Sequence, residues 1–204
     1  MSDLPPGAWV SPATARNRGP ILEVLKSRLP AHGLVLEIAA GAGEHAVFSA
    51  AAFPALRWLP TDADPGALAS IAAWRQHARS PNLLAPLRLD ASEPDDWPVD
   101  QADAVVCINM IHISPWSATA GLMTGAARIL PPGGAVFLYG PFIQSDVETA
   151  PSNLDFDQSL RARNPEWGVR RLDDVAALAA GQGLALCERV AMPANNLTLV
   201  LRKA

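Results

Sequence analysis

The fold of this chain follows from one stretch, Val35-Leu36-Glu37-Ile38-Ala39-Ala40-Gly41-Ala42-Gly43-Glu44-His45. An apolar run ends in two glycines and leads directly into a helical pattern, which predicts a buried strand, a tight turn and a helix N-terminus. The backbone N–H groups at such a turn can bind a ligand. The same residues also satisfy the loose glycine pattern of dinucleotide-binding enzymes, with alanine in the third position. A tight turn without any ligand is the purely structural alternative.

Short apolar runs alternate with helical patterns on both sides of this turn, which is typical of a parallel α/β sheet. We expect strands at 34–38, 56–62, 83–89, 104–109 and 135–139. Helices are expected at 15–29, 44–52, 65–77, 115–130 and 173–181. Asp64 and Pro65 suit the N-cap and the first turn of the third of these helices. Two last strands, 184–190 and 197–202, are joined by a turn-rich hairpin connection.

Between residues 142 and 171 the alternation stops, and only one short helical pattern is visible, near 155–163. An interruption this long inside a compact domain usually carries function, although a surface excursion is the alternative. The length of 204 residues fits one domain with a substantial core. We therefore predict a single domain over 1–204, with an N-terminal cap segment at 1–32 and an insertion at 142–171 that covers the substrate.

Composition excludes several classes of protein. Half of the residues are hydrophobic and 18% are charged, as in globular proteins, and the net charge of −4 gives no basic footprint for nucleic acid or anionic membranes. The N-terminus lacks a signal-peptide pattern and no apolar run could span a bilayer, so a cytoplasmic location is expected. Cys107 and Cys187 lie in apolar runs and are expected to be small core residues. No metal-ligand spacing is visible, which predicts a metal-independent protein.

Carboxylates at the ends of three successive strands suggest which ligand the glycine turn binds. Glu37 in an apolar strand is costly unless a charge or hydrogen bond compensates it. Asp62 closes the second strand, where a carboxylate can accept both ribose hydroxyls. Asp90 closes the third, where it could accept from an adenine amino group, although capping the turn at 91–93 is an equally good interpretation.

Together these acids favour an adenosine ligand with a cationic tail, which is S-adenosylmethionine (SAM), because Glu37 would repel a pyrophosphate. Gly41 and Gly43 would let the backbone approach this ligand. His45, in the first turn after the glycines, is a candidate partner for the SAM carboxylate.

This arrangement resembles the class I SAM-dependent methyltransferases, and within them the family of domain of unknown function 938, also called methyltransferase-like protein 26. The matching segments include Ser11-Pro12-Ala13-Thr14-Ala15-Arg16-Asn17-Arg18-Gly19-Pro20-Ile21, Asn109-Met110-Ile111-His112-Ile113, Gly140-Pro141-Phe142, Pro165-Glu166-Trp167-Gly168 and Met192-Pro193-Ala194-Asn195-Asn196-Leu197. The resemblance implies a Rossmann-like α/β fold: a seven-stranded, mostly parallel sheet with an antiparallel C-terminal hairpin strand and helices on both faces. It also implies SAM as the cofactor, with Arg16 and Asn17 near its carboxylate, but it names no methyl acceptor.

Residues at the ends of the fourth and fifth strands would face the acceptor. Asn109 could contact the sulfonium side of SAM or the acceptor, and His112 is the best-placed general base, although a histidine there is more often structural. Tyr139 and Phe142 could wall the pocket, although simple packing is as common for aromatic residues there. In the insertion, an acceptor site with an anionic or aromatic preference could be formed by Asn153, Arg161, Arg163 and Trp167. Asp157 and Arg161 could equally be an ordinary i,i+4 surface pair.

The sequence therefore predicts a SAM-dependent methyltransferase that acts on a small-molecule acceptor, as a monomer or homodimer, without general nucleic-acid binding and without a membrane partner. A catalytically silent SAM-binding sensor or partner module is the alternative from another class. An NAD(P)-dependent oxidoreductase is disfavoured by Glu37, by Asp90 and by the terminal hairpin.

Overall fold

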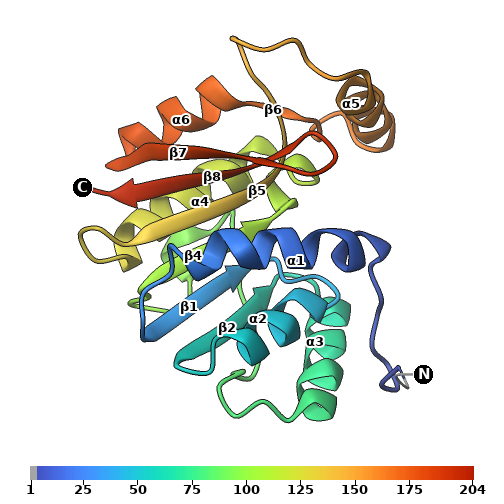
Figure 1. Ribbon diagram of the computed structural model, residues 1–204, viewed down its shortest axis with the longest axis vertical. Coiled ribbons are helices and arrows are strands. Elements are labelled where there is room, and N and C mark those ends of the chain that lie inside the picture. Colours follow the sequence, from blue (N-terminus) through green and yellow to red (C-terminus); the bar gives the residue numbers. More distant parts are fainter. Residues whose placement is uncertain (1–3) are drawn as a thin grey trace.

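A computed structural model describes residues 4–204 as helices packed around one central sheet (Figure 1). The strands are β1 (Gly33–Ile38), β2 (Leu56–Asp62), β3 (Leu87–Arg88), β4 (Ala104–Ile108), β5 (Ala135–Ile143), β6 (Arg170–Arg171), β7 (Leu184–Met192) and β8 (Asn196–Lys203). The α-helices are α1 (Pro12–Lys26), α2 (Glu44–Ala52), α3 (Pro65–Ala78), α4 (Trp116–Ile129), α5 (Pro151–Arg163) and α6 (Leu172–Gly181). Two short 3-10 helices are η1 (Pro94–Asp96) and η2 (Met110–His112).

Seven strands lie side by side in the order β3-β2-β1-β4-β5-β8-β7, and β6 pairs with the end of β5. All pairs are parallel except β5 with β8 and β7 with β8, which are antiparallel. The predicted α/β fold is therefore confirmed, including its antiparallel C-terminal hairpin. Three residues, 193–195, connect the paired ends of β7 and β8, and Ala194 and Asn195 both have a left-handed backbone at φ 57.

Successive residues of the central strands point to opposite faces of the sheet, and both faces are buried. Leu36 of β1 and Val105 of β4 pack in one apolar cluster with α4 and α6. Val35 and Val106 pack on the other face with α1 and α2. Helices therefore cover both faces, as Figure 1 shows.

Four elements differ from the sequence-based expectation by three residues or more at an end. The first helix, predicted over 15–29, spans 12–26. The third strand, predicted over 83–89, is reduced to 87–88, with one isolated bridge between Trp58 and Leu83. Pro86 lies between these two pairings and has no N–H to donate to a ladder. β5 continues past Tyr139 to Ile143, because its last residues pair with β8 and β6. The helix expected near 155–163 begins earlier, at Pro151.

The two cysteines differ in burial. Cys107 in β4 is buried, as predicted, whereas Cys187 is exposed, so its prediction as a core residue is wrong. Cys187 lies in β7, which is the outermost strand of the sheet, at an irregularity in the register between Leu186 and Glu188. Within residues 4–204 no helix is both long enough and apolar enough to cross a bilayer.

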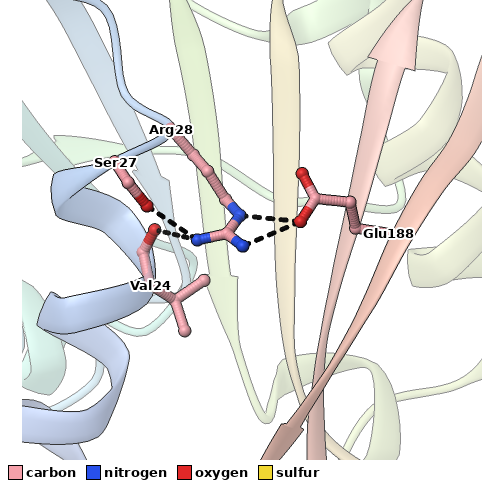
Figure 2. Close-up of polar contacts among 4 residues, drawn as sticks. All are labelled: Val24, Ser27, Arg28 and Glu188. Atoms are coloured by element: carbon pink, nitrogen blue, oxygen red, sulfur yellow. Dashed lines mark hydrogen bonds and ion pairs between the residues drawn. The ribbon is translucent and has the colours of Figure 1, made fainter.

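Arg28 fastens the end of α1 to the edge strand β7 (Figure 2). Its Nε and Nη2 atoms both donate to Oε2 of Glu188, at 3.0 and 2.8 Å. Its Nη1 atom donates to the carbonyl oxygen of Val24 and to the hydroxyl of Ser27, at 3.1 and 2.8 Å. One guanidinium therefore caps the C-terminal turn of α1 and joins it to the C-terminal hairpin.

Candidate functional site

The order of the strands reverses between β1 and β4, and open α/β sheets bind ligands outside the carboxyl ends of the strands at such a point. Two non-glycine residues with left-handed backbone flank this point: Ala39 follows β1 at φ 53, and Asn109 follows β4 at φ 62. Such a conformation costs of order 1–3 kcal/mol, and residues that adopt it cluster at functional sites. The backbone alone thus marks the crevice between β1 and β4 as the candidate site.

The two glycines of the turn have different roles. Gly41 has φ 58, and a Cβ atom added there would have no heavy atom within 4 Å. Gly43 has φ 93, and a Cβ there would lie 2.9 Å from the Cα atom of Ile71 in α3. Gly41 therefore leaves open space in which a ligand could approach the backbone, whereas Gly43 allows the turn to pack against α3.

Asp62 holds the glycine turn from the end of β2. Its Oδ2 accepts from the N–H of Gly41 at 2.9 Å, and its Oδ1 accepts from the N–H of Asp64 at 3.0 Å. Each carboxylate oxygen keeps a further lone pair for a ligand hydroxyl. Asp64 accepts from the N–H of Gly66 at 2.6 Å, which confirms it as the N-cap of α3.

Asp90 caps a turn and also lines a cavity, so its position is compatible with both of the roles predicted for it. Its Oδ1 accepts from the N–H and the hydroxyl of Ser92, at 2.9 and 2.6 Å, and these bonds lower the pKa of Asp90. The turn-capping interpretation is therefore correct. The same residue also lines a cavity of about 280 Å³ at the carboxyl ends of β1 and β3, with Ile38, Ala39, Ala63, Leu89, Ala91, Ser92, Met110, Ser114, Pro115, Ser117 and Ala118.

A larger cavity, of about 600 Å³, lies between α1, the end of β5, α5 and the β7–β8 turn. It brings together five residues that the sequence singled out: Arg16, Asn17, Asn109, Tyr139 and Asn153. Figure 1 shows α5 and the β7–β8 turn on the side to which the β1 and β2 arrowheads point. Of the residues that line this cavity, only Arg16 carries a full charge at neutral pH.

The loop after β4 separates the two cavities. Asn109 and Ile113 line the larger cavity, and Met110 and Ser114 line the smaller one. A ligand that occupied both cavities would therefore pass this loop.

Asn17 carries an unused acceptor beside the larger cavity. Its Oδ1 atom is buried and has no hydrogen-bond partner among residues 4–204, a situation that costs about 1–3 kcal/mol unless a ligand donates to it. Burial raises the pKa of the neighbouring Tyr139, and the Asn17 side chain and the charge of Arg16 oppose that shift. An ammonium group could donate to Asn17, and a carboxylate could pair with Arg16.

Glu37 is 1% exposed and lines neither cavity. Its Oε2 atom accepts from the indole Nε1 of Trp58 at 2.6 Å. Burial raises the pKa of Glu37 to about 7; the bond from Trp58 opposes this shift, and the charge of Asp62 adds to it. The carboxyl group is thus enclosed beside Trp58 and close enough to Asp62 for their charges to interact, and it could act on a bound cation through its charge and not by contact.

Both predicted histidines lie outside the two cavity linings; His112 is buried and His45 is half-buried. Burial lowers the pKa of His45 to about 4, with a contribution from Arg18. Burial lowers the pKa of His112 to about 3, with a contribution from Arg170. The His112 ring packs edge-on against Phe142 at 5.1 Å between centroids, and its Nε2 atom has no hydrogen-bond partner in the described part of the chain. Phe142, expected to wall the pocket, is likewise buried in the apolar core.

The remaining predicted residues of the insertion lie apart from Asn153. Arg161 forms the i,i+4 ion pair with Asp157, at 2.8 Å, which was the surface-pair alternative. The guanidinium of Arg163 lies 5.6 Å from the ring centroid of Trp167. Arg161, Arg163 and Trp167 line neither cavity.

Sequence reasoning missed a further wall of the larger cavity, formed by Ala13, Ile113, Pro141, Ser152, Phe156, Pro193, Ala194 and Asn196. The β7–β8 turn reaches the cavity because Asn195 joins it to α5. The Asn153 amide donates to the Asn195 carbonyl at 2.9 Å, and the Asn195 amide donates to the Ser152 hydroxyl at 3.1 Å. More than 40 residues separate these partners, so no local pattern signals the contact.

Across residues 4–204, no three His, Cys, Asp or Glu side chains lie close enough together to hold a metal ion.

Comparison with known proteins gives a family and a fold. A family model described as "Protein of unknown function (DUF938)" matches residues 8–203. An O-methyltransferase family protein from Burkholderia thailandensis is 17% identical over 94% of this chain and 57% of its own, with a TM-score of 0.79. An O-methyltransferase family 2 protein from Planctomyces limnophilus, in complex with apigenin, is 20% identical over 94% and 60%, with a TM-score of 0.77.

Human N-acetylserotonin methyltransferase, in complex with SAM, is 15% identical over 94% of this chain and 53% of its own, with a TM-score of 0.77. This chain spans little more than half the length of these solved structures, and at such identities the likeness shows the fold, which is that of the class I SAM-dependent methyltransferases.

Proposed function

The chain belongs to the DUF938 family, and we propose that this member is a SAM-dependent methyltransferase whose acceptor is a small molecule. The observation that carries the proposal is the pair of cavities on either side of the loop after β4. The smaller has the carboxylate of Asp90 in a mostly apolar lining. The larger has Arg16 and the partnerless Oδ1 atom of Asn17. An adenosine with an amino-acid tail requires these two environments side by side.

The residues present fit SAM as a cofactor. Asp90 could accept from the adenine amino group, and Asp62 could accept from the ribose hydroxyls in addition to its bond from Gly41. Asn17 is suited to the ammonium group and Arg16 to the carboxylate of the amino-acid end. Glu37 would stabilise the cationic part through its charge. The contacts from Asp62 and His45 stay predictions, because neither residue lines either cavity.

When bound, SAM supplies an electrophilic methyl group on a sulfonium. The chain would contribute binding, alignment and exclusion of water, which supply much of the catalysis in an in-line displacement. We propose that Asn109, between the two cavities, orients the reacting groups and that Tyr139 and Asn153 contact the acceptor. In this proposal the single domain has an N-terminal cap at 1–32 and a covering insertion at 142–171.

His112 stays a prediction as general base. A base is required only if the acceptor must lose a proton. The ring is 1% exposed, and a pKa of about 3 makes it a weak proton acceptor. Arg161, Arg163, Trp167 and Phe142 would contact the acceptor only after a rearrangement, since all four lie outside the cavity linings.

Binding of SAM tests the proposal. SAM and its demethylated product should each raise the melting temperature, with about 2.7 kcal/mol of stabilisation at 100 times the dissociation constant. Asp62→Ala should weaken SAM affinity at least about tenfold and, by releasing two backbone N–H groups, lower the free energy of unfolding by about 1–3 kcal/mol. The control Asp95→Ala, at an exposed acid of η1, should change neither quantity. Stabilisation by NAD alone would overturn the proposal.

Turnover separates the enzyme from the silent module. Incubation with labelled SAM and a small-metabolite extract should transfer label to a product. Stoichiometric SAM binding without any labelled product would instead favour a SAM-binding sensor.

A further inference from the structure

Arg170, on the short strand β6, joins the insertion to the loop that follows β4. Its Nε atom donates to the carbonyl oxygen of Ile111 at 2.8 Å. Its Nη2 atom donates to the carbonyl oxygens of Ser114 and Glu166, at 2.6 and 3.0 Å. The guanidinium also lies 5.5 Å from the ring centroid of Trp116, at the start of α4. One side chain therefore holds both ends of the loop from Ile111 to Ser114.

The backbone around Arg170 adds two contacts to the same loop. The N–H of Gly168 donates to the carbonyl oxygen of His112 at 3.0 Å. The N–H of Arg170 points to Nδ1 of His112 at 3.4 Å, a long hydrogen bond. These contacts give His112 a structural role: its Nδ1 accepts from the insertion, while its Nε2 lies against Gly140, where an added Cβ would be too close.

The loop needs such support because it begins in an unfavourable conformation. Asn109 has φ 62, and it lies directly before the single turn η2. A backbone of this kind persists only where its surroundings over-determine it. Guanidinium bonds to carbonyl oxygens are charge-assisted and directional, and the rigid fork of Arg makes several in a fixed planar geometry from separate nitrogen atoms, whereas a Lys ammonium has all its donors on one nitrogen.

We propose that Arg170 is a positioning residue of the candidate site. By holding the carbonyls of Ile111 and Ser114 it fixes the loop that divides the two cavities, and so fixes the cofactor relative to the acceptor. The identity of the ligands in the two cavities rests on the proposed function, whereas the hydrogen bonds by which Arg170 holds the loop do not depend on it. Arg170 itself lines neither cavity, so it acts through Asn109, Met110 and Ile113.

Hydrogen exchange of the ligand-free protein tests the hold on the loop. Arg170→Met removes the donors and keeps an apolar stem over Trp116, and Arg170→Lys keeps the charge without the fork. Both should speed exchange of the amides at 110–114 at least about tenfold, while amides of β1 and β4 are unchanged. Arg171→Met is the matched control, because this exposed neighbour lies 4.0 Å from Asp174 and its side chain forms no hydrogen bond with the loop within residues 4–204. Unchanged exchange at 110–114 in both Arg170 variants would overturn the proposal.

Calorimetric titration with SAM tests the effect on the site. Both Arg170 variants should bind SAM at least about tenfold more weakly at matched folded fractions, and the Arg171 variant should bind like wild type. If Arg170→Lys bound SAM with wild-type affinity, the positive charge alone would be sufficient, and the proposal that the guanidinium geometry positions the loop would be refuted. Faster loop exchange with unchanged SAM affinity would remove Arg170 from the site. If the wild-type chain bound no SAM, the proposed function would fail, and the exchange result would still decide whether Arg170 holds the loop.

Discussion

The burial of the Glu37 carboxyl group costs free energy when the group is ionised. Glu37 is buried in the central strand β1, accepts one bond from Trp58, and forms no ion pair with any residue between 4 and 204. Its pKa is raised from 4.5 to about 7, chiefly by burial. Between these two pH values the unfolded chain has released this proton and the folded chain retains it. Stability from this group is therefore lost as the pH rises through that window.

Glu37→Gln should remove this dependence on pH. Glutamine resembles the protonated acid and can still accept from Trp58, so the variant should be more stable than wild type by about 1–3 kcal/mol at pH 8 and nearly equal at pH 4.5. Urea denaturation at intervals from pH 4.5 to 8 measures the difference. Glu23→Gln, at an exposed position of α1, is the control and should follow the wild-type curve. Parallel curves for wild type and Glu37→Gln would show that Glu37 does not titrate in this window.

Individual residues were predictable where their role depends on near neighbours. Asp64 as a helix cap, Asp90 as a turn cap and the Asp157–Arg161 pair all follow from spacings of four residues or fewer. The environment of His112 could not be predicted from near neighbours, because its partners Gly168 and Arg170 come from the insertion, more than 50 residues away.

Among the elements, α5 has a weak hold on the rest of the fold. Only Asn153 and Leu160 of this helix are buried, and Phe156, which lines the larger cavity, is 39% exposed. Its N-terminal end is attached by the bonds between Asn195 and residues 152–153, and its middle by the N–H of Val169, which donates to Oδ1 of Asp157 at 2.7 Å. An element held in this way can open without global unfolding.

Asn153→Ala should release the N-terminal end of α5. The change removes the donor to the Asn195 carbonyl, which should lower the free energy of unfolding by about 1–2 kcal/mol. Amide exchange at 151–163 should accelerate more than exchange in β4 or β5. Gln158→Ala, at an exposed position of the same helix, is the control. Equal acceleration throughout the protein would mean that α5 does not open on its own.

The elements themselves were largely predictable, and the reason is their periodicity. α2 spans 44–52 as expected, β1 and β4 differ from expectation by one residue at one end, and α4 differs by one residue at each end. The prediction of a strand over 83–89 was wrong for most of its length, because this apolar run contains Pro86, which interrupts the hydrogen-bond ladder. For α5 the pattern showed a helix but not which side meets the cavity, and so Arg161, Arg163 and Trp167 were grouped with Asn153. That distinction depends on contacts with the β7–β8 turn, which local sequence does not encode.

At the scale of the whole molecule, the bond between Arg28 and Glu188 connects the first helix to the last hairpin (Figure 2). α1 contributes Arg16 and Asn17 to the larger cavity, and the hairpin contributes Pro193, Ala194 and Asn196. The tie therefore joins the two elements that enclose this cavity from the ends of the chain.

Arg28→Met should loosen that enclosure. We expect a melting temperature lower by about 2–4 °C, because the variant loses the α1 cap as well as the pair, and a modest loss of SAM affinity, about two- to fivefold. Lys26→Met is the control, since it removes an exposed i,i+3 pair on the same helix. A thermal shift matched by the control would mean that the tie adds nothing beyond surface charge.

The bond between Arg28 and Glu188 also has a consequence for the order in which the site can assemble during synthesis of the chain. Glu188 follows Arg28 by 160 residues, so at 5–20 residues per second a ribosome makes it roughly 10–30 s later. During that interval α1 has no partner in β7, and the larger cavity lacks the turn at 193–196. The glycine turn and the carboxylates of β1 and β2 can assemble early, but the larger cavity cannot be completed until the last strands have been synthesised. Ligand binding by a nascent chain would thus report that its synthesis has reached the hairpin.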